Sequence, residues 1–366
     1  MRGRRDPTSV RAANEKERVI GGAVVALEIV LVAIAVSLFF SFWNGFTDAA
    51  NAIATIVATR TLAPFQAVAM SAVGNFLGLY FGGAVAATIW KGILDNQVVE
   101  ETSTSMGLPV ATLGAALYIG AIVGGLVWDV ITWYFGLPCS ETHVLVGSLV
   151  GVGLYIGGVA AVQFPSVLQR VVLPMLYSPF LAFGFAFLFT ALIIRVFRRV
   201  PPTRINRRFR QMQIVSSFVF SFSHGSQDGQ KVVGLLLGLL AFQGISTSPT
   251  PLWVILAVQL AISLGTLLGG WRIVKTMAMK ITKLRPYQGF SAETGGAIVL
   301  LGTAAVGFPV STTHVINSAI MGTGATTRLS AVRWGVARRI VWTWVLTLPM
   351  AALFGFLAMF VIGLFL

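Results

Sequence analysis

The chain has 366 residues, of which 56% are hydrophobic and only 10% are charged, and its mean hydropathy is +0.84. No water-soluble fold has enough interior for so many apolar residues, so this composition excludes a soluble protein and predicts one that crosses a membrane several times. The net charge of +14 suggests a nucleic-acid partner, but the basic residues cluster between apolar runs, as in cytoplasmic loops of membrane proteins. We therefore expect no nucleic-acid partner.

Apolar runs recur along the chain after a polar N-terminal tail at residues 1–19, which is too charged to be the apolar core of a signal peptide. The runs cover residues 20–43, 65–90, 108–135, 143–164, 171–194, 252–271, 294–308 and 340–366. A helix crosses the bilayer with about 20 apolar residues, and barrel strands would be shorter and alternating in polarity. We therefore predict an all-α polytopic membrane protein with about ten membrane crossings.

The first half of the chain, which we predict to form a membrane unit over residues 20–194, contains two polar motifs. The first is NGFTDAAN at 44–51, and the second is GLPCSETHVLVGSLVG at 136–151. Pro138 would end one helix and start another, which puts Ser140 near a helix N-terminus. Free N–H groups at such a terminus bind phosphate or sulfate without lysine or arginine. The alternative is ordinary helix capping and hydroxyl hydrogen bonding within the bundle.

The second half repeats both motifs. A linker at 195–210 contains seven arginines and no acid, which predicts a cytoplasmic location, and a second membrane unit follows at 211–366. HGSQDGQK at 224–231 keeps the Gly and the Asp of the first motif in register. GFPVSTTHVINSAIMG at 307–322 is identical to the first hairpin motif at seven of sixteen positions. These matches predict an internal duplication with a broken helix, or re-entrant hairpin, in each half.

The charges of two equivalent loops indicate how the halves are oriented. The loop at 91–106 has a net charge of −2, whereas the loop at 272–285 has five basic residues and no acid. Because basic loops stay in the cytoplasm, the two loops should lie on opposite faces of the membrane, and the repeats should be inverted. Inverted repeats with broken helices are typical of secondary transporters, which hold their substrate near the midplane by alternating access.

Acidic residues at membrane depth are the main candidates for coupling. An intramembrane charge costs at least about 2.5 kcal/mol, so we take a functional role as the first hypothesis and a packing role as the alternative. A dianion in a low-dielectric site needs a cation, and carboxylates beside neutral oxygens bind Na⁺ or accept H⁺. Three histidines within the motifs would shuttle protons or bond to carbonyls, and both readings stay open. The acids are Glu28, Asp48, Asp129, Glu141, Asp228 and Glu293.

Four stretches closely resemble the signatures of the inorganic phosphate transporter (PiT) family, in the family's order. They are NGFTDAANAIATIVATR, WDVITWYFGLPCSETHVLVGS, FSHGSQDGQKVVG and GFPVSTTHVI. The resemblance implies a non-enzymatic symporter in the cell membrane that imports inorganic phosphate with H⁺ or Na⁺, needs no other cofactor, and has a homodimer as an option. It implies phosphate contacts from Ser140, Thr142, Ser311, Thr312 and Thr313. The expected coupling residues are Asp48, Asn51, Asp129, Glu141, Gln227, Asp228 and Glu293, with a Na⁺ option at Asp48, Asn51 and Asp228.

Three departures from the family pattern concern the coupling ion. Sodium-dependent relatives commonly have Asn before the motif Asp, where this chain has Thr47 and Gln227, and Glu141 replaces a hydroxyl residue at the first hairpin tip. The chain thus looks more like the bacterial low-affinity, proton-coupled branch. An ionised Glu141 would repel phosphate, so we hypothesise that it is protonated or turned away when substrate is bound. The alternative within the family is a sulfate permease. An anion channel would have no reason for paired intramembrane aspartates. An intramembrane enzyme using Ser311 and His314 would lack a residue to orient that histidine, and the duplication favours transport.

Overall fold

The computed structural model describes residues 7–79 and 83–366, and their side chains except those of 7–26 and 279. The polar tail predicted at 1–19 lies outside the residues whose side chains are described. The described residues form helices joined by short turns, and the one strand-like contact among them is an isolated bridge between Leu94 and Val162. The all-α prediction is therefore confirmed for the described part of the chain.

The helices of the two halves meet within the basic linker, where α8 ends at Val196 and α9 begins at Pro202. The first set is α1 (Pro7–Ala58), α2 (Pro64–Gly78), α3 (Ala84–Lys91), α4 (Asn96–Met106), α5 (Val110–Phe135), α6 (Glu141–Gly157), η1 (Gly158–Ala161), α7 (Phe164–Val167), η2 (Leu168–Val172) and α8 (Leu173–Val196). The second set is α9 (Pro202–Phe242), α10 (Leu252–Leu268), α11 (Trp271–Lys280), α12 (Pro286–Val306), α13 (Thr312–Ala325), η3 (Leu329–Ala331) and α14 (Trp334–Gly363).

Fewer than ten of the described helices are long and apolar enough to be candidates for crossing a membrane. Six helices among the described residues are long and apolar enough to cross a membrane, and seven if α10 and α11, bent by 68° at their junction, form one span. Several segments that we expected to cross are short or interrupted. Helices α2 and α3 have 15 and 8 residues, and the polar Asp motif interrupts the apolar sequence of the 41-residue α9.

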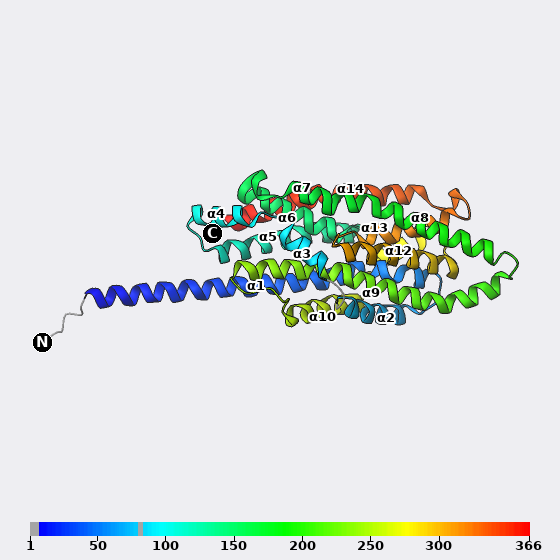
Figure 1. The fold of residues 1–366 in the computed structure, drawn as a ribbon, viewed down its shortest axis with the longest axis horizontal. Coiled ribbons are helices and arrows are strands. Elements are labelled where there is room, and N and C mark those ends of the chain that lie inside the picture. Colours follow the sequence, from blue (N-terminus) through cyan, green and yellow to red (C-terminus); the bar gives the residue numbers. More distant parts are fainter. Residues whose placement is uncertain (1–6, 80–82) are drawn as a thin grey trace.

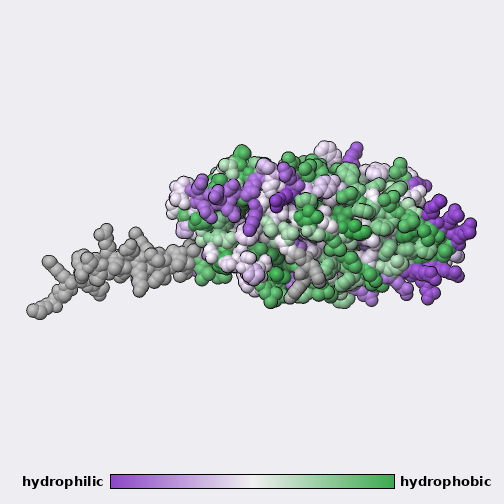
Figure 2. Space-filling model, viewed as in Figure 1, coloured by the Kyte–Doolittle hydropathy of each residue, from purple (hydrophilic) through white to green (hydrophobic). Residues whose placement is uncertain are grey.

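The bundle is elongated, with most helices running along its long axis (Figure 1). The α8–α9 turn lies at one end, and α4 and the C-terminus lie at the other (Figure 1). Figure 2 shows hydrophobic residues over the middle of the bundle and hydrophilic residues gathered toward the two ends. This distribution is expected when the long axis crosses the bilayer, because only the ends then meet water and lipid headgroups.

Two helix breaks are built alike and bring polar residues into the bundle. Gly136 follows α5 and Gly307 follows α12, both in the left-handed conformation (φ 63° and 82°) that closes a helix C-terminus. After each break a serine caps the next helix. Ser140 Oγ accepts a bond from the His143 N–H at 3.2 Å, and Ser311 Oγ accepts one from the His314 N–H at 3.1 Å. The chain therefore breaks at both places where a helix break was predicted, and the helices that begin after the breaks are α6 and α13.

The helices that carry the two Asp motifs meet in the centre of the bundle. Helix α1 packs against α9, and both contact α13, while α6 contacts α9. The core around them consists of two clusters of buried apolar residues, one mainly from α1, α3, α5, α6 and α9 and the other mainly from α1, α11, α12 and α13. This packing places the polar motifs of distant segments side by side.

Candidate functional site

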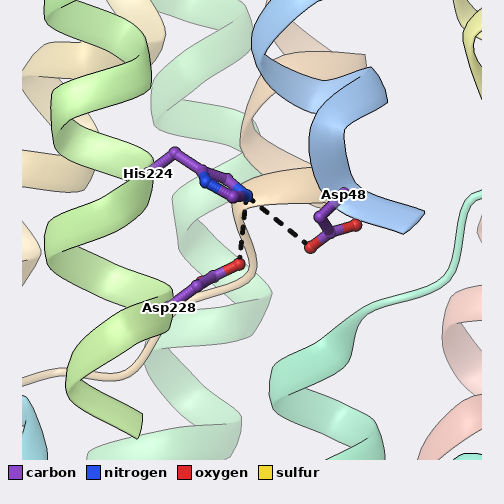
Figure 3. Close-up of side chains that lie close together, drawn as sticks. All are labelled: Asp48, His224 and Asp228. Carbon is purple, nitrogen blue, oxygen red and sulfur yellow. Dashed lines mark ion pairs between the residues drawn. The ribbon is translucent and has the colours of Figure 1, made fainter. Parts of the chain in front are cut away.

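The two motif aspartates face the same histidine. Asp48 comes from α1, and Asp228 and His224 come from α9, and all three side chains are buried. His224 Nε2 lies 3.3 Å from Asp228 Oδ2 and 3.9 Å from Asp48 Oδ2 (Figure 3). The other ring nitrogen, Nδ1, lies 3.0 Å from Asn75 Oδ1, which holds the ring in place from α2. The imidazole thus bridges the carboxylates of the two halves of the chain.

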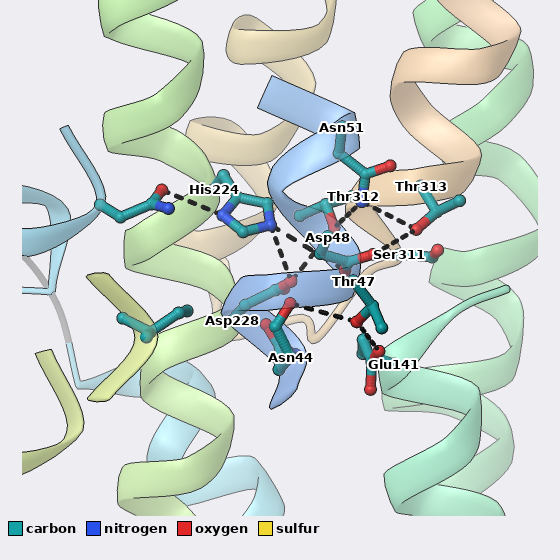
Figure 4. Close-up of polar contacts among 12 residues, drawn as sticks. Asn44, Thr47, Asp48, Asn51, Glu141, His224, Asp228, Ser311, Thr312 and Thr313 are labelled. Carbon is teal, nitrogen blue, oxygen red and sulfur yellow. Dashed lines mark hydrogen bonds and ion pairs between the residues drawn. The ribbon is translucent and has the colours of Figure 1, made fainter. Parts of the chain in front are cut away.

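The tip of the second hairpin is bonded to both aspartates. The Thr312 hydroxyl donates to Asp228 Oδ2 at 3.2 Å, and the Thr313 hydroxyl donates to Asp48 Oδ1 at 3.4 Å (Figure 4). Asn51, one turn beyond Asp48 on α1, donates through Nδ2 to Thr313 Oγ1 at 2.9 Å. Five of the residues selected from the sequence therefore form one buried cluster.

The first hairpin reaches the same region by a different set of contacts. The Thr142 hydroxyl donates to the Val310 carbonyl of the second hairpin at 3.0 Å, so the two hairpin tips touch. Glu141 Oε1 accepts a bond from the Thr47 hydroxyl of α1 at 2.9 Å (Figure 4). Since Thr47 precedes Asp48, the acid at the first hairpin tip is connected to the first Asp motif.

Asp129 lies close to Cys139 and Glu141, in a group separate from the one that the motif aspartates form with His224. One ligand atom from each of Asp129, Cys139 and Glu141 lies within 4.8 Å of the others, and the Cys139 thiol donates to Asp129 Oδ1 at 3.2 Å. Both acids are buried, and none of the ion pairs identified in the described part of the chain includes either of them. Two carboxylates so close together in a buried site favour sharing a proton or binding a cation.

Lys231 is a site residue that our reading of the sequence missed. It is 2% exposed on α9, forms an ion pair with Asp228 Oδ1, and donates from Nζ to the Val310 carbonyl at 3.2 Å. The sequence did contain a signal, because Lys231 is the only Lys or Arg between Arg210 and Arg272 and lies three residues after Asp228. A basic residue alone inside an apolar segment, one helical turn from an acid, is a candidate for a buried ion pair.

Two of the predicted coupling residues have their contacts elsewhere. Glu293 on α12 accepts bonds from Thr55 Oγ1 at 2.6 Å, from Gln213 Nε2 at 3.1 Å and from the Ser216 hydroxyl. Gln227 Nε2 donates to the Leu300 and Phe308 carbonyls at 3.1 and 3.3 Å, at the end of α12. Glu293 thus belongs to a second buried polar cluster, and Gln227 stabilises the break before α13.

His143 and His314, the histidines of the two hairpins, contact each other next to α8 and α14. The ring centroids of His143 and His314 are 4.8 Å apart, and His314 stacks on Trp344 at 3.9 Å. Both rings line a largely apolar cavity of about 560 Å³ next to α8 and α14. Among the described residues, His143 Nδ1 and His314 Nε2 have no hydrogen-bond partner. Of the three histidines, His224 is therefore the one that contacts the aspartates.

Known proteins are similar to this chain in sequence and in fold. A family model described as "Phosphate transporter family" matches residues 44–208 and 197–355. A "probable low-affinity inorganic phosphate transporter" of Rhizobium meliloti is 44% identical over 341 residues, covering 92% of this chain and 98% of that protein. A protein with the same description from Bacillus subtilis is 36% identical over 342 residues, covering 93% and 99%.

A solved structure described as "The sodium-dependent phosphate transporter" has a TM-score of 0.78 to this chain at 25% identity, covering 93% of this chain and 100% of the other. The motifs, the apolar helices and these likenesses lead to the same family. The chain is a multi-pass membrane protein that belongs to the phosphate transporter family.

Proposed function

We propose that the protein is a secondary active transporter in the cell membrane that imports inorganic phosphate together with cations, with protons favoured over sodium ions. The observation that carries this proposal is that the second hairpin tip is bonded to both buried motif aspartates and that the first hairpin tip contacts the second. A hydroxyl-lined site suits a tetrahedral oxyanion, and buried carboxylates beside it suit the cation that must accompany the anion.

Phosphate would lie between the N-termini of α6 and α13. The first turn of a helix has unpaired N–H groups and a partial positive charge, which attract an oxyanion. In the structure the hydroxyls of Thr312 and Thr313 donate to Asp228 and Asp48. We propose that they turn to phosphate when a cation neutralises the acids. The residues that would contact phosphate are Ser140, Thr142, Ser311, Thr312 and Thr313.

The first Asp motif has the oxygen atoms that a coupling cation needs. Asn44 Oδ1, Asp48 Oδ2 and Asn51 Oδ1 are buried and have no hydrogen-bond partner among the described residues. Their spacing of four and three residues puts them on the same face of α1. The carboxylate could accept a proton, or the carboxylate and the two amide oxygens together could bind Na⁺. Asp228, in the second half of the chain, would add a second negative charge near this cation.

The first hairpin favours protons as the coupling ion. Asp129 and Glu141 lie close together in a buried site, so a proton shared between them relieves their repulsion. Glu141 accepts a bond from Thr47, the residue before Asp48, so this candidate proton carrier lies next to the first motif. Sodium remains the second candidate, because the structural neighbour is named as sodium-dependent. The sulfate alternative has no support from the relatives above, whose names specify phosphate.

We further propose that residues 20–194 and 211–366 form two inverted repeats with about ten crossings, counting the short helices of broken spans, joined by the cytoplasmic linker 195–210. Two observations support this. The helix breaks after α5 and α12 have the same construction. The acidic α4 lies at the opposite end of the bundle from the α8–α9 turn, whereas Arg285 lines the same cavity as Arg198 of that turn. Alternating access would then be a movement of the halves about the site between them.

The deciding experiment is uptake of radiolabelled phosphate by proteoliposomes that contain the purified protein. We expect accumulation driven by an inward proton gradient, abolished by an uncoupler and unaffected by excess unlabelled sulfate. Accumulation that needs a sodium gradient instead would support phosphate as the substrate but identify Na⁺, not H⁺, as the coupling ion. Label displaced by sulfate, or no accumulation under either gradient, would contradict the proposal.

A further inference from the structure

The two Asp motifs differ on the helix face that carries the aspartate. When their Gly and Asp are in register, Asn44, Asp48 and Asn51 correspond to His224, Asp228 and Lys231. The spacing of four and then three residues puts each set on one helix face. The first face therefore has two neutral amides beside its carboxylate, whereas the second has a histidine and a lysine at the same positions.

The two carboxylates have different partners as a result. On the first face, Asp48 Oδ1 accepts from Thr313 at 3.4 Å, and Oδ2 faces His224 at the longer distance of 3.9 Å. Asp48 Oδ2 and the amide oxygens of Asn44 and Asn51 have no hydrogen-bond partner among the described residues. On the second face, both carboxylate oxygens of Asp228 are engaged. Oδ1 pairs with the Lys231 ammonium, and Oδ2 accepts from Thr312 and faces His224 at 3.3 Å. The first face thus offers oxygen atoms to a cation, while on the second an amino group already takes that position.

The Lys231 ammonium is held in this position by the fold. It is 2% exposed, and it lies three residues from its acid on the same helix, so the pair stays together when α9 moves as a rigid body. Its second bond, to the Val310 carbonyl, reaches the residue before the Ser311 cap. A buried ammonium is tolerated only with an anion and acceptors around it, and Asp228 and Val310 provide them. The positive charge therefore lies at the hairpin tip that we assign to phosphate.

We infer that Lys231 is a tethered cation that replaces a mobile coupling cation at Asp228, so that, of the two Asp motifs, only the first is left for an ion that moves with phosphate. This inference rests on the proposed function, since it concerns how many cations accompany each phosphate. It also defines a specificity determinant, because a neutral residue at position 231 would leave Asp228 in need of an ion from solution, as Asp48 is.

The test variant is Lys231→Asn, which gives the second face the residue found at position 51 in the first. Its thermal unfolding, in detergent, is compared in sodium chloride and in choline chloride of equal ionic strength. We expect unfolding at a lower temperature than wild type in choline and recovery by about 3–4 °C in sodium, the shift expected for an ion at about 100 times its dissociation constant. Lys231→Arg, which keeps the charge, should show no more sodium response than wild type.

A Lys231→Asn protein that unfolds at the same temperature in both salts would overturn the inference. If this variant is not recovered from membranes, the double variant Lys231→Asn, Asp228→Asn removes both charges and should be recovered, without a sodium response. Failure to recover the double variant as well would also overturn the inference, because charge compensation would then not be what Lys231 supplies.

The unfolding measurement needs no transport, which separates this inference from the proposed function. Wild-type proteoliposomes that take up no phosphate would contradict the proposed function alone. Proteoliposomes that take up phosphate, together with a Lys231→Asn protein indifferent to sodium, would contradict the role of Lys231 alone.

Discussion

Three buried acids of the bundle have three different environments. Asp228 has an ammonium partner in Lys231, Glu141 lies beside a second carboxylate, and Glu293 accepts bonds from three uncharged side chains. A carboxylate without a cationic partner is costly to ionise away from water. Among these three, only Asp228 has a cationic partner in the described part of the chain, so we expect Glu141 and Glu293 to need a proton or a mobile cation for neutrality and their substitutions to act differently.

Replacing Glu141 tests the proton carrier. Glutamine keeps an oxygen that accepts the Thr47 hydroxyl bond but does not titrate, so Glu141→Gln should fold normally. An inward gradient of about one pH unit stores about 1.4 kcal/mol per proton, equivalent to about tenfold accumulation of phosphate. We expect the variant to lose this accumulation in proteoliposomes. Glu100→Gln, at an exposed position of α4, is the matched control. Full pH-dependent uptake by Glu141→Gln would remove Glu141 from the coupling mechanism.

Replacing Glu293 tests whether the second polar cluster supports the fold. Glu293→Ala leaves the donors of Thr55, Gln213 and Ser216 without their shared acceptor, and each unpaired buried donor costs about 1–3 kcal/mol. We expect thermal unfolding several degrees below wild type. Glu293→Gln retains an acceptor oxygen and should unfold close to wild type. Equal unfolding temperatures for the two variants would mean that the cluster contributes little to stability.

At the scale of helices, the crossing of α1 and α10 positions the first Asp motif. A Cβ added at Gly45 would lie 2.0 Å from the Ile262 carbonyl oxygen, and one added at Gly265 would lie 1.9 Å from that of Phe42. Both obstacles are backbone atoms, so neither side of the crossing has room for a side chain. Small residues allow membrane helices to approach this closely. Because Gly45 is one turn from Asp48, the crossing and the Asp face move together.

We therefore expect Gly265→Ala to force the two helices apart, lowering the unfolding temperature and the rate of phosphate uptake. The matched control is Gly302→Ala on α12, where an added Cβ meets nothing within 4 Å. In a helix interior that change gains about 0.5–1 kcal/mol, so the control should be at least as stable as wild type. Wild-type stability and uptake in Gly265→Ala would show that the helices have room to separate without harm.

At the scale of the whole molecule, the basic and acidic ends determine orientation. The α8–α9 turn and the helix ends on either side of it carry the linker arginines, and α4 carries Glu100 and Glu101 at the opposite end (Figures 1 and 2). Basic segments remain in the cytoplasm during insertion. The turn should therefore lie inside the cell and α4 outside, a direction that follows from charge and not from the shape of the bundle.

Cysteine labelling checks this orientation. Cys139 is the only native cysteine and is buried, so wild type should not react with a membrane-impermeant maleimide. Thr104→Cys, exposed on α4, should be labelled in intact cells, and Thr203→Cys, exposed at the start of α9, only after permeabilisation. The reverse pattern would show that the protein has the opposite orientation in the membrane. Labelling of both sites in intact cells would contradict the placement of the two ends on opposite faces.

Local properties of the sequence determined the class of protein, its helix breaks and the polar residues of its centre. Composition predicts membrane helices, and Gly136, Pro138 and their counterparts in the second half interrupt helices by their own backbone chemistry. The motif residues also identified the phosphate transporter family. The expectation of about ten crossings was less exact, since six or seven described helices qualify by length and composition. The reason is that hydropathy alone does not separate a full membrane span from a short or broken one.

Only the tertiary structure decided which of these residues are partners. It joins Asp48 to Asp228 through His224, pairs Lys231 with Asp228 beneath the second hairpin tip, and gives Glu293 its own set of donors on α1 and α9. Each of these environments, except the Lys231 pair on one helix, combines segments from both halves of the chain. The spacing of residues along one helix determines which face they share, but the neighbour of that face depends on how the helices pack.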